Sequence, residues 1–150
     1  MKINLASRSP RRRELLDQIG IEYELIDIDI DESCHDDENP EDYVCRIARE
    51  KAEVGKSLSN NGLPVLAADT AVVLDREILG KADNRDDVIS MLQRLSGKTH
   101  YVLSAVTVIG ESEATRLNIS KVTFKELSAD EIEHYASTDE PLGKAGGYAI

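Results

Sequence analysis

The amino terminus places a cluster of arginines at the start of a helix, and this feature limits the fold more than any other. Residues 1–13 hold five basic side chains and no acidic one, although the chain carries a net charge of −11. The apolar residues 3–6 predict a short strand, which a serine-rich turn follows. Ser9 fits an N-cap, Pro10 the first helical position, and Gly20 the end of the helix. Such a unit presents free N–H groups and guanidinium groups, and it favours a phosphate-binding site.

Arginine runs also occur in solvated basic patches, phosphorylation sites and nucleic-acid tethers. In this chain Leu15, Leu16 and Ile19 recur at helical spacing, so the arginines occupy the first turn of a packed helix. The acidity of the remaining chain and the absence of tryptophan disfavour general nucleic-acid binding. A polyphosphate-binding site is therefore the leading interpretation of this segment.

The composition is that of one water-soluble domain. A length of 150 residues suffices for one domain with a hydrophobic core. Hydrophobic residues make up 41%, with no run long enough to span a membrane and no apolar leader at the N-terminus. We therefore expect a cytoplasmic protein in which Cys34 and Cys45 are reduced thiols and not zinc ligands.

Two charged residues stand out in the first half of the chain. Residues 22–30 predict a strand with a bulge near Leu25. If this strand continues, Glu32 points inward; otherwise Glu32 is one of several solvated acids. Residues 40–58 predict a helix in which Lys51 extends an apolar stripe. Such a lysine either snorkels at the rim of the stripe or points into a cleft, and the sequence leaves both alternatives open.

Asp69 lies in the middle of the most apolar run of the chain. Residues 64–74 predict a buried strand, with a break at the polar pair as an option and a hairpin after it. A lone carboxylate in such surroundings costs several kcal/mol, roughly, unless a cation or hydrogen bonds compensate it. The expected partner is a metal ion, a lysine or a water molecule that Asp69 deprotonates. The alternative is an aspartate that caps backbone amides at the strand end.

The second half of the chain adds a helix from residue 84 or 85 to 96, strands at 99–109 and 114–124, and a helix at 128–137. Together these elements indicate a mixed α/β domain. A glycine-rich loop that carries Lys144 follows at 139–148. Its glycines allow the backbone to approach a ligand closely, and a simple mobile loop is the alternative.

The unusual residues together match the needs of phosphoanhydride cleavage. Basic groups neutralise phosphates, and carboxylates such as Glu32 and Asp69 can hold a divalent cation, Mg²⁺ or Mn²⁺. One carboxylate can also orient or deprotonate water. No histidine is needed for this chemistry, and no role is assigned to His35, His100 and His134.

Several motifs occur in a fixed order along the chain: Leu-Ala-Ser-x-Ser-Pro-Arg-Arg-x-Glu-Leu-Leu (5–16), Ala-Arg-Glu-Lys-Ala (48–52), Ala-Ala-Asp-Thr (67–70), Leu-Gly-Lys (79–81), Leu-Ser-Gly (95–97) and Asp-Glu-Pro-Leu-Gly-Lys-Ala-Gly-Gly-Tyr (139–148). Each motif is weak alone, but the ordered set resembles the Maf family of nucleoside triphosphate pyrophosphatases. The resemblance covers the whole chain. It implies one domain over 1–150, with a mixed β-sheet flanked by helices and a cleft, like inosine triphosphate pyrophosphatase.

The resemblance also implies the reaction, which is hydrolysis between the α- and β-phosphates to give a monophosphate and pyrophosphate. Asp69 would be the general base, and Glu32 and Asp69 would bind the metal. The resemblance assigns Ser7, Arg12, Lys51 and Lys81 to the triphosphate. Arg11 and Thr70 match the residues that set the nucleobase preference of the dTTP/UTP subgroup, and Lys144 is a further expected substrate-binding residue. The alternatives are 7-methyl-GTP or another modified nucleotide as substrate, or a catalytically idle nucleotide-binding regulator of cell division. A second copy of the chain, in a homodimer, is a further partner option.

Two departures from the family pattern concern the loops and the end of the chain. Ala82 follows Lys81 where the family usually has proline, which should loosen this loop and keep the lysine. The sequence stops at Ile150, where family members continue with Gln-Gly and several tens of residues. We expect lower stability and impaired activity from a chain that lacks this C-terminal part.

Overall fold

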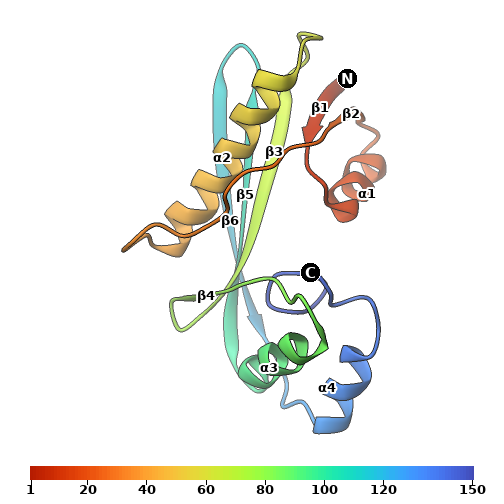
Figure 1. Ribbon diagram of the computed structural model, residues 1–150, viewed down its shortest axis with the longest axis vertical. Helices are drawn as coiled ribbons and strands as arrows, with labels where there is room; N and C mark the ends of the chain where they lie inside the picture. The colour runs from red at the N-terminus through yellow and green to blue at the C-terminus, as the bar shows by residue number, and fades with distance from the viewer. The chain divides into compact units, whose positions relative to one another are not determined.

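Six strands form one mixed sheet in the order β2-β1-β3-β5-β6, with β4 paired to β3. The computed structural model describes residues 1–150 (Figure 1). The strands are β1 (Lys2–Ala6), β2 (Glu22–Ile26), β3 (Val65–Leu74), β4 (Glu77–Leu79), β5 (Thr99–Ile109) and β6 (Glu113–Thr123). The helices are α1 (Pro10–Gln18), α2 (Pro40–Leu58), α3 (Arg85–Leu95) and α4 (Ala129–Ala136). The predicted mixed α/β class is confirmed.

The chain divides into two compact units. The first comprises residues 1–69 and 104–118, and the second comprises residues 70–103 and 119–150. The expectation of a single Maf-like domain stays a prediction. None of the helices combines the length and the apolar character that crossing a bilayer requires.

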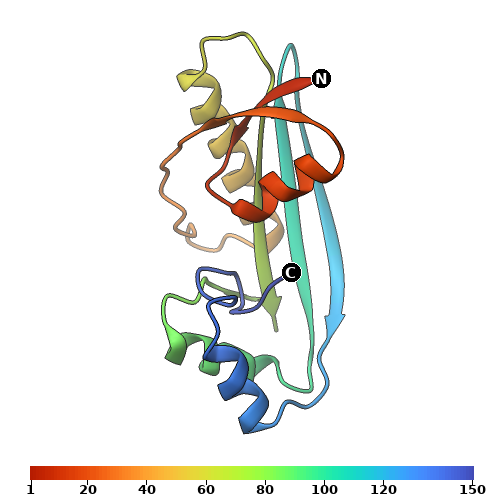
Figure 2. The ribbon, with the colours of Figure 1, turned by 90° about the vertical axis from the view of Figure 1, so that its right-hand side faces the viewer.

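In the first unit, β1 lies between two parallel strands. Leu5 is in register with Leu25 of β2 and with Leu66 of β3. Leu16 of α1 packs with Ile3 and Leu5 in one apolar cluster, and Figure 2 shows α1 beside this strand. The strand and helix predicted at the amino terminus are therefore confirmed, and β1 fixes where the turn after it begins.

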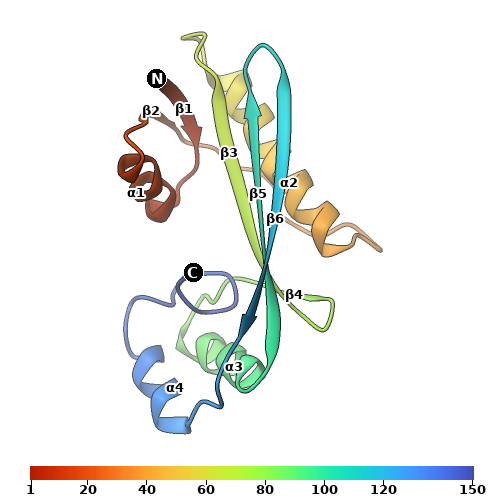
Figure 3. The same cartoon turned by 180° about the vertical axis from the view of Figure 1, so that it is seen from behind.

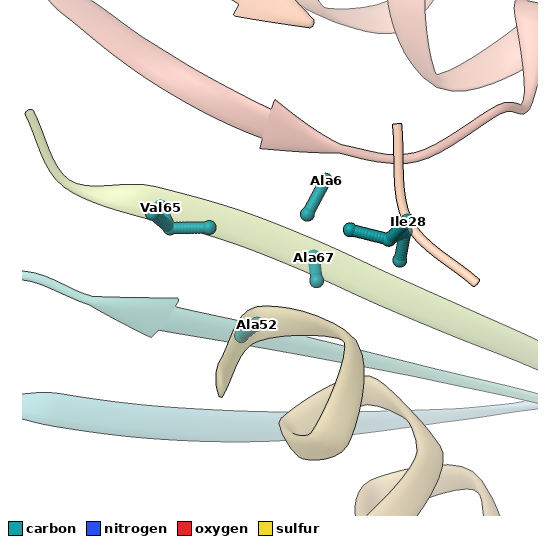
Figure 4. Close-up of a cluster of buried hydrophobic side chains, with 5 residues drawn as sticks. All are labelled: Ala6, Ile28, Ala52, Val65 and Ala67. Atoms are coloured by element: carbon teal, nitrogen blue, oxygen red, sulfur yellow. The ribbon is translucent and has the colours of Figure 1, made fainter. Parts of the chain in front are cut away.

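Helix α2 packs closely on β1 and β3. A buried cluster joins the helix to the strands and to the segment after β2: Ala6, Ile28, Ala52, Val65 and Ala67 (Figure 4). Gly55 lies at the contact, and a Cβ at this position would be 2.7 Å from the Cβ of Ala6. Because such a distance is a steric clash, glycine allows the close approach of helix and strand. The small residues thus determine where the side chains of α2 reach the sheet.

The strand predicted at 22–30 ends at Ile26 and shows no bulge, so this part of the prediction is wrong. Its partner β1 ends at Ala6, which pairs with Ile26, and no backbone is left for further pairing. Residues 27–39 lie outside helices and strands, although Ile28 is buried in the core. By contrast β3 runs from Val65 to Leu74 as one continuous strand, so the optional break is wrong.

In the second unit, α3 and α4 lie side by side (Figure 3) and share an apolar cluster that contains Val88 and Ile132. His100 of β5 is fully buried, with the rings of Phe124 and Tyr148 packed edge-on against it. Its Nε2 lies 2.7 Å from the Tyr148 hydroxyl oxygen. Burial lowers the pKa of His100, which favours the neutral ring. His100, to which the sequence assigns no role, is a core residue.

The glycine-rich loop packs against the protein core. Gly146 has φ +69°, and a Cβ there would lie 2.9 Å from both methyl carbons of Val72. The close approach that glycine permits at this position is therefore to a core side chain. Gly143 has φ +72° as well, but nothing lies within 4 Å of its Cβ position.

A Gly146→Ala variant is expected to lower the free energy of unfolding by about 1–3 kcal/mol, because overpacking at Val72 adds to backbone strain. Thermal unfolding measures the effect. Gly143→Ala is the matched control, since it introduces the strain without the clash and should cost less. Equal melting temperatures of the two variants would contradict the role of Gly146 in packing.

Candidate active site

A buried lysine joins two carboxylates in the first unit. Lys51 of α2 is 7% exposed, and its Nζ lies 2.9 Å from Oδ1 of Asp69 and 2.9 Å from Oε1 of Glu32. Asp69 is on β3 and is 5% exposed, whereas Glu32 belongs to the segment after β2 and is partly exposed. Lys51 therefore points inward, and the snorkelling alternative is wrong. The structure brings three of the predicted site residues together.

The charges of this cluster act on one another and on Arg12. Burial raises the pKa of Asp69, and the neighbouring charge of Glu32 raises it further. Lys51 and Arg12 act in the opposite direction but do not cancel the effect of burial. Lys51 and Arg12 together balance the charges of Glu32 and Asp69, so a divalent cation at these carboxylates would be matched by the negative charge of a bound triphosphate.

The ligand chemistry also fits Mg²⁺ or Mn²⁺. Each carboxylate has a second oxygen, and hard divalent cations prefer oxygen ligands. No group of three or more His, Cys, Asp or Glu side chains that could hold a metal occurs in the chain. The remaining ligands would therefore come from water and phosphate oxygens, an arrangement that Mg²⁺ readily adopts.

The turn after β1 carries a second cluster. Ser7 is buried, and its Oγ accepts hydrogen bonds from Arg12 Nη1 and from the backbone N–H of Ser9, each at 3.1 Å. Ser9 occupies the N-cap position of α1, but its side chain makes no capping bond. Ser9 is therefore the N-cap residue as predicted, but the hydroxyl that binds the backbone here belongs to Ser7.

Arg12 belongs to the same electrostatic environment as the lysine cluster. Burial lowers the pKa of Arg12, while the negative charges of Asp69 and Glu32 raise it. A guanidinium group that is partly buried near two carboxylates suits an anionic ligand, since it lacks a full hydration shell. Arg11 differs, because it is exposed and its Nη1 pairs with Glu14 Oε2 at 3.2 Å. The structure therefore groups Arg12, but not Arg11, with Ser7.

The second unit carries Thr70, Lys81 and Lys144. Thr70 follows Asp69 on β3, so its side chain points to the opposite face of the strand. Lys81 and Ala145 form an antiparallel bridge, and Gly146 N–H donates to the Gly80 carbonyl at 3.0 Å. The two lysine-bearing segments, 79–82 and 139–148, are therefore neighbours within this unit.

Ala82, which replaces the family's usual proline, takes part in this contact. Its N–H donates to the Lys144 carbonyl at 3.3 Å, and its carbonyl accepts from the Gly143 N–H at 2.8 Å. Proline has no N–H and could not make the first of these bonds. The Lys144 ammonium donates to the Glu140 carbonyl at 2.6 Å.

Sequence reasoning missed the side chains that hold the segment around Glu32. Tyr43 and Arg46, from the first turns of α2, donate hydrogen bonds to the carbonyls of Glu32 and Ser33. Their spacing of three residues places both on one face of the helix, which was the only available signal. The irregular course of residues 27–39 left no pattern from which to predict the contact.

Comparison with known proteins agrees with these observations. The family model described as Maf-like protein matches residues 2–150. A dTTP/UTP pyrophosphatase of Alkalilimnicola ehrlichii is 55% identical over 99% of this chain and 76% of its own length. A dTTP/UTP pyrophosphatase of Myxococcus xanthus is 50% identical over 97% of this chain and 74% of its own length.

Among solved structures, the Staphylococcus aureus Ham1 protein matches with a TM-score of 0.52 at 17% identity, covering 81% of this chain and 70% of that chain. At this identity the match supports the fold alone. The ordered motifs, the α/β sheet and the full-length match to the family model agree, and the chain belongs to the Maf family.

Proposed function

We propose that this chain hydrolyses nucleoside triphosphates, with dTTP and UTP favoured, to the nucleoside monophosphate and pyrophosphate. The enzyme class, a nucleoside triphosphate pyrophosphatase, is the one that its curated relatives carry. The observation that best supports the reaction is the buried Lys51 held between Glu32 and Asp69. Clusters of buried, charged side chains with a perturbed pKa are typical of catalytic sites.

Asp69 is proposed as the general base. Burial raises its pKa, which makes the carboxylate a better proton acceptor than an ordinary aspartate, and the neighbouring Lys51 acts on this pKa in the opposite direction. In the proposed step, an oxygen of Asp69 accepts a proton from the attacking water. The water oxygen bonds to phosphorus, the bond between the α- and β-phosphates breaks, and pyrophosphate leaves with the electron pair.

The triphosphate is proposed to bind at the turn after β1. Arg12 supplies a guanidinium group, Ser7 a hydroxyl, and the first turn of α1 free N–H groups. Lys51, Lys81 and Lys144 are proposed to neutralise further phosphate charge. A divalent cation held by Glu32 and Asp69 would polarise the phosphate oxygens and offset their charge.

The preference for dTTP and UTP rests on Arg11 and Thr70, which match the family pattern for this subgroup, and on the names of the relatives. The exposed side chain of Arg11 is available for such a contact, since its ion pair with Glu14 lies on the helix surface. The proposed setting is the cytoplasm, with the free nucleotide as the substrate.

Pyrophosphate release from a panel of nucleotides with Mg²⁺ tests the proposal. We expect dTTP and UTP to give the highest kcat/KM among dTTP, UTP, CTP, dGTP and 7-methyl-GTP. A higher kcat/KM for 7-methyl-GTP would instead support the alternative substrate. Binding of all nucleotides without release of pyrophosphate from any would support the idle regulator.

A further inference from the structure

The segment that carries Glu32 has no secondary structure to hold it. Residues 27–38 follow the last residue of β2, and seven of these twelve residues are acidic. Like charges in this segment repel one another, and the charge of Glu32 also repels that of Asp69, whose pKa it raises. The contact between Glu32 and Lys51 therefore needs further support, because one ion pair from a partly exposed side chain contributes little.

Two side chains of α2 hold the backbone at and after Glu32. The Tyr43 hydroxyl donates to the Glu32 carbonyl at 2.8 Å, and Arg46 Nη2 donates to the Ser33 carbonyl at 2.9 Å. The Arg46 guanidinium also lies over the Tyr43 ring, 5.6 Å from its centroid. Consecutive carbonyls are thus fixed by one helix, the helix that also presents Lys51.

Arg46 is itself held by two acidic side chains. Its Nε lies 2.6 Å from Glu38 Oε1, and its Nη2 lies 2.8 Å from Glu38 Oε2, which is a bidentate pair. Nη1 lies 3.2 Å from Glu50 Oε1. The side chains of Arg46 and Glu38 are only 17% and 10% exposed, and the pair lowers the pKa of Glu38 to about 2.

Glu38 also closes the loop on itself, because its Oε2 accepts a hydrogen bond from the His35 N–H at 3.1 Å. Arg46 therefore binds the acidic segment at two places, at Ser33 in its middle and at Glu38 at its end. We call the three side chains Glu38, Tyr43 and Arg46 the Glu32 brace. All three lie in the first unit, as do Glu32 and Lys51.

We propose that the Glu32 brace consists of positioning residues, which hold the Glu32 carboxylate against Lys51 and Asp69 and so maintain the site for the reaction. The inference rests on the proposed function, since it assigns Glu32 a part in catalysis. In this proposal the brace acts through Glu32, because Tyr43 and Arg46 bind the carbonyls of Glu32 and Ser33. Removing an outer hydrogen bond of this kind typically costs about tenfold or more in activity.

Tyr43→Phe is the sharpest test, because it removes one hydroxyl and leaves the ring in place. We expect kcat/KM for dTTP to fall about tenfold and hydrogen exchange of residues 27–38 to accelerate, with the melting temperature nearly unchanged. Tyr101→Phe is the matched control, since Tyr101 is exposed on β5. Tyr101→Phe should change neither kcat/KM for dTTP nor the hydrogen exchange of residues 27–38.

A double-mutant cycle with Glu32→Gln separates positioning from general stability. If the Glu32 brace acts through Glu32, then adding Tyr43→Phe to Glu32→Gln should reduce kcat/KM by less than twofold further. Arg46→Met should lower kcat/KM as Tyr43→Phe does, and this loss should likewise depend on Glu32. Arg49→Met is its control, because Arg49 pairs with Glu113 outside the brace.

Additive losses in the cycle, or an unchanged kcat/KM in Tyr43→Phe, would overturn the proposal while leaving the proposed function intact. A wild-type chain that releases no pyrophosphate from any nucleotide would overturn the proposed function, and with it the catalytic role of the brace. Faster hydrogen exchange of residues 27–38 without a change in kcat/KM would show that the brace stabilises this segment but does not position Glu32 for catalysis.

Discussion

An Asp69→Asn variant is expected to release pyrophosphate from dTTP at least about a hundredfold more slowly than the wild-type chain. Asparagine has nearly the same shape as aspartate but cannot accept a proton from water, and a general base contributes about 10²–10⁴ to the rate. Binding of dTTP should be retained, since Arg12, Ser7 and the first turn of α1 are unchanged. Steady-state kinetics and calorimetric titration with the nucleotide measure the two quantities.

Asp75→Asn is the matched control for this variant. Asp75 is exposed in the hairpin after β3, with φ 51°, a conformation that asparagine also tolerates. The turnover of Asp75→Asn should equal that of the wild-type chain. An Asp69→Asn variant that keeps more than about a tenth of the wild-type kcat would be incompatible with a general base at this position.

A Lys51→Met variant is expected to lose about 3–5 kcal/mol of stability at neutral pH, because it leaves the buried Asp69 charge without its ammonium partner. The variant should also lose most of its turnover. Lys56→Met is the control on the same helix, where the side chain is partly exposed, and it should cost less than about 1 kcal/mol. Chemical denaturation of both variants measures the difference.

The loss of stability in Lys51→Met should depend on pH, and its direction follows from the pKa of Asp69. The pKa of Asp69 is already above its ordinary value of 3.8, and removing Lys51, which lowers it, will raise it further. An acid with a raised pKa binds more protons in the folded state than in the unfolded state. Stability therefore falls as the pH rises from the ordinary pKa of Asp69 to its raised pKa in the folded chain. The Lys51→Met defect should therefore shrink toward acidic pH, and the acid limb of its residual kcat/KM should move to higher pH. A defect that does not shrink as the pH falls from neutral toward 3.8, the ordinary pKa of aspartate, would contradict this account.

Local signals predicted most of the secondary structure. Asn39 caps α2 by accepting from the Asp42 N–H, Asn84 caps α3 in the same way, and Ser128 and Glu131 form a capping box at the start of α4. Each of these signals lies within four residues of the helix start, so tertiary contacts are not needed to interpret it. The strand after α1 was predicted too long, because its end depends on the length of β1, a partner that local periodicity does not reveal.

The candidate site was predicted residue by residue but not as an arrangement. Asp69 and Lys51 stood out because a charge in an apolar run or stripe needs a partner. Their pairing, and the addition of Glu32, depend on three elements that meet only after folding. The spacing of Tyr43 and Arg46 was the only signal for the role of Arg46, and it was weak, since a helical arginine with nearby glutamates usually forms exposed ion pairs.

The pairing of β1 with β3 decides which polar side chain reaches Lys51. Leu5 stands opposite Leu66, so Asp69 and Thr70 take fixed, opposite faces of the strand. Sliding β3 by a single residue against β1 would exchange the two, turning a hydroxyl toward the ammonium and sending the carboxylate to the other side of the sheet. A one-residue insertion or deletion between Val65 and Asp69 would consequently abolish activity while leaving the count of strands and helices the same.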